Sequence, residues 1–316
     1  LVRRLLENTS NESWLKASVL DEKDTGVLLA PPAPKAATES GTANGTGDAG
    51  KTGPKPDLYE IAAERHKLSP AFPGVGDGKA FVNEPPRNFA DRAQHRAFGE
   101  AVRGCSVPDA GSMVGVETAE QMVGTAREAF PSWRDTDAVE RCNIIVRAAG
   151  LMRQRRDELA GVMVKEAGKT WAEADADICE AIDFCEYYAR CAAPMFVRER
   201  LGRFIGELDE QWYQPKGVAV VISPWNFPGA IFTGMVTAAL VCGNAVIAKP
   251  AEQTPGIAKA VCDILWSAGV PREVLHYCHA RGETVGAQLV RDPRVCMVAF
   301  TGSKAVGLDI IAASGQ

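Results

Sequence analysis

The sequence predicts an α/β protein in which a doubly wound parallel sheet follows a layer of helices. Two observations lead to this fold class. After Gly217, short and nearly continuous apolar runs alternate with helical stretches, as is typical of parallel strands covered on both faces. Before that point, within residues 117–192, apolar residues recur at helical spacing. In such a sheet, ligands bind at the carboxyl ends of the strands.

The beginning of the chain divides into three predicted segments. Residues 1–25 alternate leucines with charged residues, which predicts a short helical tail. Residues 26–57 consist mainly of Pro, Gly, Ala, Ser and Thr. A segment with so little apolar surface to bury is predicted to be a flexible linker. Residues 58–116 are predicted to lead from this linker into the globular part.

Residues 117–192 are predicted to form the helical layer. Thr118 with Gln121, and Asp137 with Glu140, have the spacing of capping boxes and predict two helix starts. Further along, one apolar helical face is expected to contain Ile178, Ile182, Cys185 and Ala189. The stretch LGRFIGELDEQWYQPKG that follows predicts extended or hairpin structure.

Strands and helices alternate in the predicted α/β domain, residues 217–316. The expected strands are residues 218–223, 244–249, 273–278 and 295–300. The expected helices are residues 229–242, 255–268, 282–291 and a last one from Ser303 onward.

Composition and charge argue against several classes of function. The 316 residues have a formal net charge of -5, so no basic face favours nucleic acid. No apolar run reaches the roughly 20 residues of a membrane helix. The nine cysteines are scattered and form no CxxC pair, which indicates reduced thiols and a cytoplasmic protein. The sequence leaves the oligomeric state open, including a homo-oligomer.

Three predicted strands end in polar or turn-forming residues, and these ends are the candidate binding edge. The first ends in SPWNFP, where two prolines hold a rigid turn around Asn226. The second ends in KPAE, where Lys249 and Glu252 could grip the hydroxyls of a ribose, or form a surface ion pair worth about 0–1 kcal/mol. The fourth ends in FTGS, where Gly302 and Ser303 open a helix. That helix start could bind phosphate, or could be an ordinary strand-to-helix turn.

Two other patterns are read as structural. EAGKT, residues 166–170, lacks the first glycine of a P-loop and is interpreted as a helix end. His276, Cys278 and His279 lie in or beside a predicted strand, where neighbouring side chains point to opposite faces. No metal site is therefore expected.

Three motifs together resemble the NAD(P)-dependent aldehyde dehydrogenase superfamily: GVAVVISPWNFP, GNAVIAKPAEQTP and DPRVCMVAFTGSKAVG. The resemblance covers nearly all of residues 115–316 and implies a Rossmann-like sheet of the type found in that family. At the start of the chain, RRLLENTSNESWL is similar to the last barrel helix of proline dehydrogenase in bifunctional proline utilisation A proteins. In those proteins, an FAD-dependent proline dehydrogenase precedes an NAD-dependent dehydrogenase acting on L-glutamate γ-semialdehyde.

The resemblance also assigns roles to single residues. Asn226 matches the amide that stabilises the oxyanion formed when a cysteine thiolate attacks the aldehyde. Contacts with the cofactor are implied for Ile222, Ser223, Pro224, Trp225, Lys249, Glu252, Gly282, Phe300, Thr301, Gly302, Ser303 and Val306. The carboxylate of Glu252 would repel the extra phosphate of NADP, which favours NAD. In the tail, Arg3, Arg4 and Glu7 match the proline site of the upstream enzyme; the alternative is a solvated charged face.

Three departures from the family pattern complete these expectations. The catalytic cysteine and the general-base glutamate are expected beyond Gln316, so that the catalytic domain is missing and this chain alone would be inactive. Ala280 replaces a glycine and is expected to add a methyl group near the adenine. Lys304 and Ala305 replace the commoner Thr-Glu. The cysteines expected in the core are Cys242, Cys262, Cys278 and Cys296.

Two alternatives stay open at this point. The chain could be a non-catalytic nucleotide-binding fragment, or a monofunctional aldehyde dehydrogenase with a disordered leader.

Overall fold

The computed structural model describes residues 70–314. The predicted tail and linker, and with them Arg3, Arg4 and Glu7, lie outside these residues. The first half of the described chain is helical and contains α4 (Arg92–Gly104), α5 (Val116–Asp135), α6 (Ala138–Gln154), α7 (Arg156–Ala167) and α8 (Trp171–Met195). Between residues 70 and 314, no helix combines the length and apolar character needed to cross a membrane.

The second half of the described chain alternates strands with helices. Its strands are β3 (Val218–Ile222), β4 (Ala245–Lys249), β5 (Leu275–Tyr277) and β6 (Val295–Phe300). Its helices are α9 (Ala230–Val241), α10 (Pro255–Ala268), α11 (Ala287–Arg291) and α12 (Lys304–Ser314), with a π-helical turn, η2 (Gly282–Gly286), before α11. Within residues 70–314, these strands form one parallel sheet in the order β5-β4-β3-β6. The predicted fold class and all four predicted strands are confirmed.

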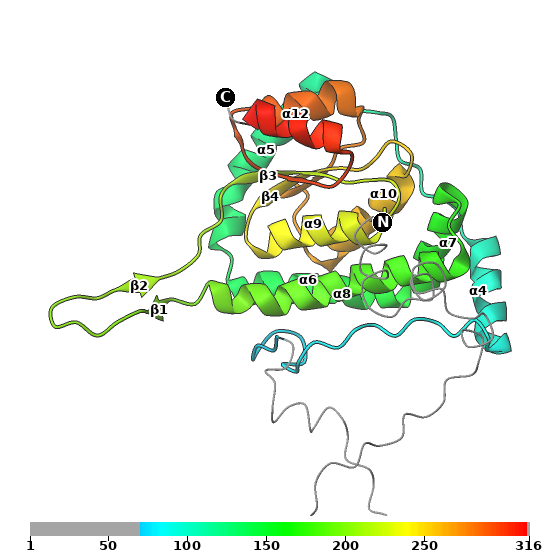
Figure 1. The fold of residues 1–316 in the computed structure, drawn as a ribbon, viewed down its shortest axis with the longest axis horizontal. Coiled ribbons are helices and arrows are strands. Elements are labelled where there is room, and N and C mark those ends of the chain that lie inside the picture. The colour runs from blue at the N-terminus through cyan, green and yellow to red at the C-terminus, as the bar shows by residue number, and fades with distance from the viewer. Residues whose placement is uncertain (1–69, 315–316) are drawn as a thin grey trace, which may run out of the picture. The chain divides into compact units, whose positions relative to one another are not determined.

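The elements are arranged in layers (Figure 1). Helices α6 and α8 lie side by side, and α9 packs between α8 and the sheet. Helices α11 and α12 lie on the opposite side of the sheet. At Gly234 on α9, an added Cβ would lie 2.8 Å from the ring of Phe184 on α8, so the absence of a side chain lets the two helices approach closely. Strands β3 and β4 are almost completely buried between the layers, which explains their unbroken Val, Ile and Ala content.

Side-chain caps fix several helix starts. Asp137 caps α6 as predicted, since its carboxylate accepts hydrogen bonds from two backbone N–H groups of the first turn. The predicted start at Thr118 is wrong, because α5 already begins at Val116, after an N-cap glycine that supplies no side-chain bond. Thr118 therefore lies inside the helix, where its hydroxyl cannot act as a cap.

In the connection between α7 and α8, one helix ends and the next begins within a few residues. Gly168 ends α7 in the left-handed conformation, with φ of 66°, so EAGKT is the helix end that the sequence indicates. Two residues later, Thr170 and Glu173 form a complete capping box at the beginning of α8. The apolar face predicted for this helix is confirmed, and its buried members are Ile178, Ile182, Cys185 and Ala189.

Cys296 is the exception among the cysteines expected in the core. Strand β6 is at one edge of the sheet, and its register with β3 shifts so that Val218 faces Val295 while Ala219 faces Met297. Cys296 lies between these partners in a bulge and is exposed. Of the other three, Cys262 and Cys278 are buried as expected, and Cys242 is half-buried.

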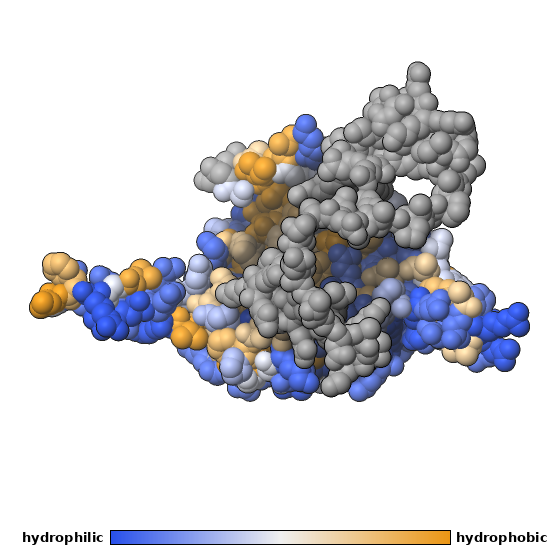
Figure 2. Space-filling model, turned by 60° about the horizontal axis from the view of Figure 1, so that its bottom comes forward, coloured by the Kyte–Doolittle hydropathy of each residue, from blue (hydrophilic) through white to orange (hydrophobic). Residues whose placement is uncertain are grey.

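An antiparallel hairpin leaves the body of the protein after α8. It pairs β1 (Glu199–Arg200) with β2 (Glu210–Gln211), as the sequence predicts, and projects far from the helical layer (Figure 1). Figure 2 shows hydrophobic residues at the far end of this projection. Ile205 in the connecting loop is 99% exposed, and Leu201 and Phe204 are also exposed. Apolar groups gathered in this way are typical of a surface that contacts another protein.

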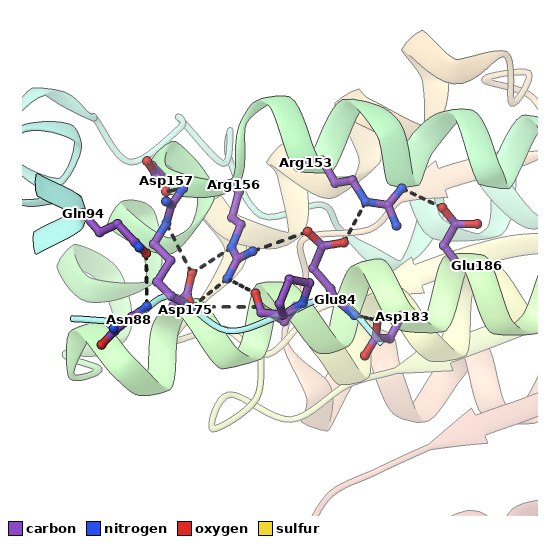
Figure 3. Close-up of polar contacts among 12 residues, drawn as sticks. Glu84, Asn88, Gln94, Arg153, Arg156, Asp157, Asp175, Asp183 and Glu186 are labelled. Carbon is purple, nitrogen blue, oxygen red and sulfur yellow. Dashed lines mark hydrogen bonds and ion pairs between the residues drawn. The ribbon is translucent and has the colours of Figure 1, made fainter. Parts of the chain in front are cut away.

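A segment of turns and irregular backbone, residues 70–91, runs along α8 and is held there by an ionic cluster (Figure 3). We use this name for Glu84 of the segment together with Arg153, Arg156, Asp175 and Glu186 of the helices. Both oxygens of Asp175 accept hydrogen bonds from the guanidinium of Arg156 at 2.8 Å. Arg153 joins Glu84, at 2.7 Å, to Glu186, at 2.6 Å. The segment is therefore fixed to the helices by charged groups, of which Arg156, Asp175 and Glu186 are largely shielded from solvent. Arg153 is 38% exposed.

Replacing Arg156 with methionine is expected to lower the free energy of unfolding by about 3 kcal/mol, because the buried carboxylate of Asp175 loses its bidentate partner. Arg134→Met is the matched control, since Arg134 also pairs with an aspartate, Asp135, but at an exposed position. That change should cost less than about 1 kcal/mol. Urea unfolding followed by circular dichroism measures both losses, and equal losses would contradict a stabilising role of the ionic cluster.

Candidate functional site

The carboxyl ends of three strands meet at one edge of the sheet. Ile222 at the end of β3 lies in register with Lys249 of β4 on one side and Phe300 of β6 on the other. The ladder continues one step beyond the strands, because the Ser223 N–H donates to the Lys249 carbonyl at 3.2 Å and the Thr301 N–H donates to the Ile222 carbonyl at 3.1 Å. The segments SPWNFP, KPAE and FTGS therefore leave the sheet side by side, as the sequence predicts.

A cavity of about 650 Å³ opens at this edge. Five of the predicted site residues line it: Ile222, Lys249, Glu252, Gly282 and Val306. The rest of the lining was not predicted from the sequence and comes from η2, α11 and α12: Glu283, Gly286, Ala287, Val290, Arg291, Asp309, Ile310, Ala312 and Ala313. Helical spacing could have found part of it, because positions 306, 309, 310 and 313 share one face of α12.

Lys249 and Glu252 form a fixed pair at the wall of the cavity. The side chain of Lys249 is only 4% exposed, and its Nζ donates to Glu252 Oε1 at 3.2 Å and to the Pro250 carbonyl at 3.1 Å. The backbone N–H of Gly282 donates to the same carboxylate oxygen at 2.6 Å. Because the lysine is buried, the alternative of a loose surface ion pair is excluded.

Glu252 is held as an ionised acceptor. Burial alone would raise the pKa of its carboxyl group, but the N–H of Gly282 and the charge of Lys249 outweigh burial and lower that pKa. Both of these bonds go to Oε1. Among the described residues, no hydrogen bond reaches Oε2, so that oxygen is free to accept hydroxyl donors from a molecule in the cavity.

The SPWNFP loop lies next to the cavity but outside its lining. Ser223 is buried and Pro224 is half-buried, whereas Trp225 is 57% exposed. Asn226 is exposed as well. Its carboxamide makes no hydrogen bond to any residue in the described part of the chain. The side-chain amide of Asn226 can therefore donate to a group outside the described part of the chain.

The FTGS turn starts α12 and also lies beside the cavity. Thr301, Gly302 and Ser303 are exposed, and the Ser303 hydroxyl accepts the N–H of Val306 at 3.3 Å. The ring of Phe300 covers Gly302 so closely that an added Cβ would lie 2.6 Å from it. The Ser303 hydroxyl caps only the N–H of Val306. The N–H groups of residues 304 and 305, in the same first turn, therefore have no partner within residues 70–314.

Ala280 is expected near an adenine, and this position stays a prediction. It is fully buried within the hydrophobic core and does not line the cavity. Its methyl group therefore does not narrow the space that opens at the sheet edge.

Burial suppresses the reactivity of most thiols in this chain. It raises the pKa of Cys142 and Cys179 to about 12 and that of Cys278 to about 11. The pKa is also raised by burial in Cys185, Cys191, Cys242 and Cys262. No cysteine is among the residues that line the cavity. These seven thiols lack the lowered pKa of an activated nucleophile.

Cys296 is expected to react first when the folded protein is treated with a small alkylating reagent, because it is the exposed thiol among the nine. Mass spectrometry of peptides after short labelling times measures the order of modification. The Cys296→Ser variant serves as control and should lose the fast phase. Modification of Cys262 or Cys185 ahead of Cys296 would contradict the bulge at the sheet edge.

The comparisons with known proteins agree with this geometry. A profile of the aldehyde dehydrogenase family matches residues 105–316. The chain is 44% identical over 192 residues to 1-pyrroline-5-carboxylate dehydrogenase 1 of Halalkalibacterium halodurans, and 47% identical over 194 residues to 1-pyrroline-5-carboxylate dehydrogenase of Geobacillus thermodenitrificans. Each match covers 61% of this chain but only 37% and 38% of the two relatives, so the chain spans less than half of their length.

Two solved structures extend the comparison. The 1-pyrroline-5-carboxylate dehydrogenase from Thermus with bound NAD matches with a TM-score of 0.72 and 38% identity, over 75% of this chain and 52% of that chain. Proline utilization A from Bdellovibrio bacteriovorus, inactivated by N-propargylglycine, matches with a TM-score of 0.71 and 34% identity, over 99% of this chain and 33% of that chain. The family profile, the fold and the arrangement of strand ends lead to one conclusion: the chain belongs to the aldehyde dehydrogenase family.

Proposed function

We propose that the protein containing this chain is an NAD-dependent dehydrogenase that oxidises L-glutamate γ-semialdehyde, derived from 1-pyrroline-5-carboxylate, to L-glutamate. The substrate is proposed from the names of the similar proteins, which are 1-pyrroline-5-carboxylate dehydrogenases. The cofactor rests on one observation above all: a buried lysine and a backbone N–H hold the Glu252 carboxylate at the wall of the cavity.

The residues around the cavity fit a dinucleotide. The free oxygen of Glu252 can accept the two hydroxyl groups of a ribose, while Lys249 holds the other oxygen in place. Val290, Val306 and Ile310 provide apolar walls for an adenine ring. The free N–H groups at the start of α12, with Gly302 and Ser303, can receive the pyrophosphate. When bound, NAD would accept the hydride that leaves the aldehyde carbon.

The remaining cofactor contacts belong to the same proposal. The backbone of Ile222, Ser223, Pro224 and Trp225 would run along the dinucleotide, and Gly282 would face the adenosine. Phe300 and Thr301 would shape the turn that precedes the pyrophosphate. A fixed negative charge at Glu252 repels a phosphate on the neighbouring ribose hydroxyl, so we infer a preference for NAD over NADP.

Asn226 would stabilise negative charge on the substrate oxygen. Its exposed side-chain amide is free to donate to an oxyanion, and removal of one such donor typically costs about 3–4 kcal/mol of transition-state stabilisation. Pro224 and Pro228 restrict the loop on either side, so that the amide needs little reorganisation. A thiolate nucleophile and a carboxylate base are proposed to come from the part of the relatives that this chain does not match.

The proposal extends to the organisation of the whole protein. The match to proline utilization A over 99% of the chain supports a bifunctional enzyme in which an FAD-dependent proline dehydrogenase comes first. Residues 1–25 would then end that enzyme, with Arg3, Arg4 and Glu7 at its proline site. Residues 26–57 would be a linker, residues 58–116 an arm, and residues 117–316 the first part of the dehydrogenase.

The environment of the protein is proposed on similar grounds. A cytoplasmic location is supported by nine unpaired cysteines. A homo-oligomer is supported by the projecting hairpin with its apolar end.

Isothermal titration with NAD and NADP tests the cofactor assignment. The protein is expected to bind NAD at least about tenfold more tightly than NADP. Glu252→Gln should weaken NAD binding by about tenfold, since a hydrogen bond to a charged group contributes about 1.5 kcal/mol or more, and should bring the two affinities closer together. Glu283→Gln is the matched control: it removes a charge from the same cavity without touching Lys249, and should preserve the preference for NAD. No binding of either dinucleotide would contradict the proposal.

A further inference from the structure

A buried carboxylate from α8 caps the beginning of α9. The side chain of Asp177 is fully shielded from solvent, and its Oδ1 accepts the backbone N–H of Ala230 at 2.5 Å. Ala230 is the first residue of α9, and the N-cap residue, Gly229, has no side chain with which to satisfy the helix itself. The carboxylate therefore takes the place of a local cap and also meets the positive end of the helix dipole.

Lys169 connects this carboxylate to the SPWNFP loop. Its Nζ lies 2.6 Å from the second oxygen of Asp177, and the lysine side chain is 10% exposed. The same Nζ lies 4.3 Å from the centre of the Phe227 ring, which is within the range of a cation–π contact. The pair thus holds the chain at two points, Phe227 and Ala230, directly after Asn226.

The fit around the pair is tight. A Cβ added to Gly229 would lie 3.0 Å from Asp177 Oδ1 and 3.2 Å from the sulfur of Met163, so the backbone comes as near to the carboxylate as a residue without a side chain allows. Burial raises the pKa of Asp177, and the charge of Lys169 together with the N–H groups of α9 opposes that effect. The charge of Lys169 accordingly favours the ionised form of the carboxylate.

An ion pair at this depth contributes little to stability for its own sake. Removing two charges from water costs several kcal/mol, and apolar residues of similar size often pack equally well. The pair instead fixes the position of the backbone. The carboxylate of Asp177 binds the N–H of Ala230 and the ammonium of Lys169 lies over the ring of Phe227, so the residues between these two points are held in one position.

We propose that Lys169 and Asp177 are positioning residues for Asn226, which orient the loop that carries the oxyanion donor. The inference rests on the proposed function, because the order of that loop matters for catalysis only when Asn226 acts as the oxyanion donor. Neither residue lines the cavity, so the pair acts on the loop and not on the cavity wall.

The test measures the order of the loop by backbone ¹⁵N relaxation in the whole 316-residue chain. In the unaltered protein, Asn226 and Phe227 should have order parameters near about 0.85, as in rigid backbone. Lys169→Met retains the length of the side chain but removes both the ion pair and the cation–π contact, and should lower these values below about 0.6. Lys169→Arg retains the charge and should restore most of the order.

The control reproduces the same chemistry at another place. Lys259 pairs with Asp263 at 2.6 Å and lies over the ring of Trp266, so Lys259→Met removes an equivalent ion pair and ring contact from α10. This control pair is more exposed than Lys169 and Asp177, so it matches them in chemistry but not in burial. Its removal should leave the order parameters of Asn226 and Phe227 unchanged. Asp177→Asn, which keeps an acceptor for Ala230 but loses the charge, provides a milder second variant that should still loosen the loop.

Two results would overturn the inference: unchanged order at Asn226 in both Lys169→Met and Asp177→Asn, or a loss of order spread evenly over α8 and α9. The affinity for NAD, measured on the same samples, keeps the two proposals apart. NAD should still bind Lys169→Met, because Lys249 and Glu252 at the cavity wall are untouched, with any loss of affinity confined to the contacts of Pro224 and Trp225 in the loosened loop. If neither protein bound NAD, the proposed function would fail while the order parameters would still decide the positioning role.

Discussion

The register between β3 and its two neighbours is the constraint on which the rest of the site depends. Ile222 stands opposite Lys249 and Phe300, so the three connecting segments leave the sheet at the same level. A slip by one residue in β4 would turn the Lys249 side chain to the other face of the sheet and separate it from Gly282. The ladder is protected by its depth, because every residue of β4 is buried.

Three carboxylates share one design: those of Asp175 and Asp177 are buried, and the side chain of Glu252 is 36% exposed. Each of them accepts a backbone N–H from a distant segment in addition to its cation: Glu252 from Gly282, Asp177 from Ala230, and Asp175 from Arg87. A cation alone attracts a carboxylate from many directions, whereas an N–H donates its hydrogen bond to the carboxylate along only one direction. The backbone bonds therefore convert charge pairs into fixed junctions between elements that are far apart in the sequence, up to 88 residues in the case of Asp175.

Local patterns account for what the sequence could predict. Strands β3 and β4 could be predicted because residues buried on both faces of a sheet are apolar without interruption. Helix α8 could be predicted because its buried residues repeat at helical spacing. The sequence could not show the bulge at Cys296, which arises from pairing with another strand. It could not show the role of Asp177 either, since WAEADADICEAIDF reads as an ordinary helix and the partner N–H lies 53 residues away. Contacts between residues that lie so far apart in the sequence leave no periodic signal in it.

Covalent continuity links the two halves of the proposed chemistry. Ile222 lines the cavity, and Asn226 follows it by four positions in the same chain, so their Cα atoms are separated by at most about 14 Å even if the segment is fully extended. Hydride transfer and oxyanion stabilisation both concern the same carbonyl group, and reacting atoms must come within about 3–3.5 Å of one another. An oxyanion donor carried by the strand that lines the proposed cofactor cavity stays close to that cavity, provided that the short loop between them holds one shape. Two prolines restrict that loop from within, and Lys169 and Asp177 restrict it from the neighbouring helix.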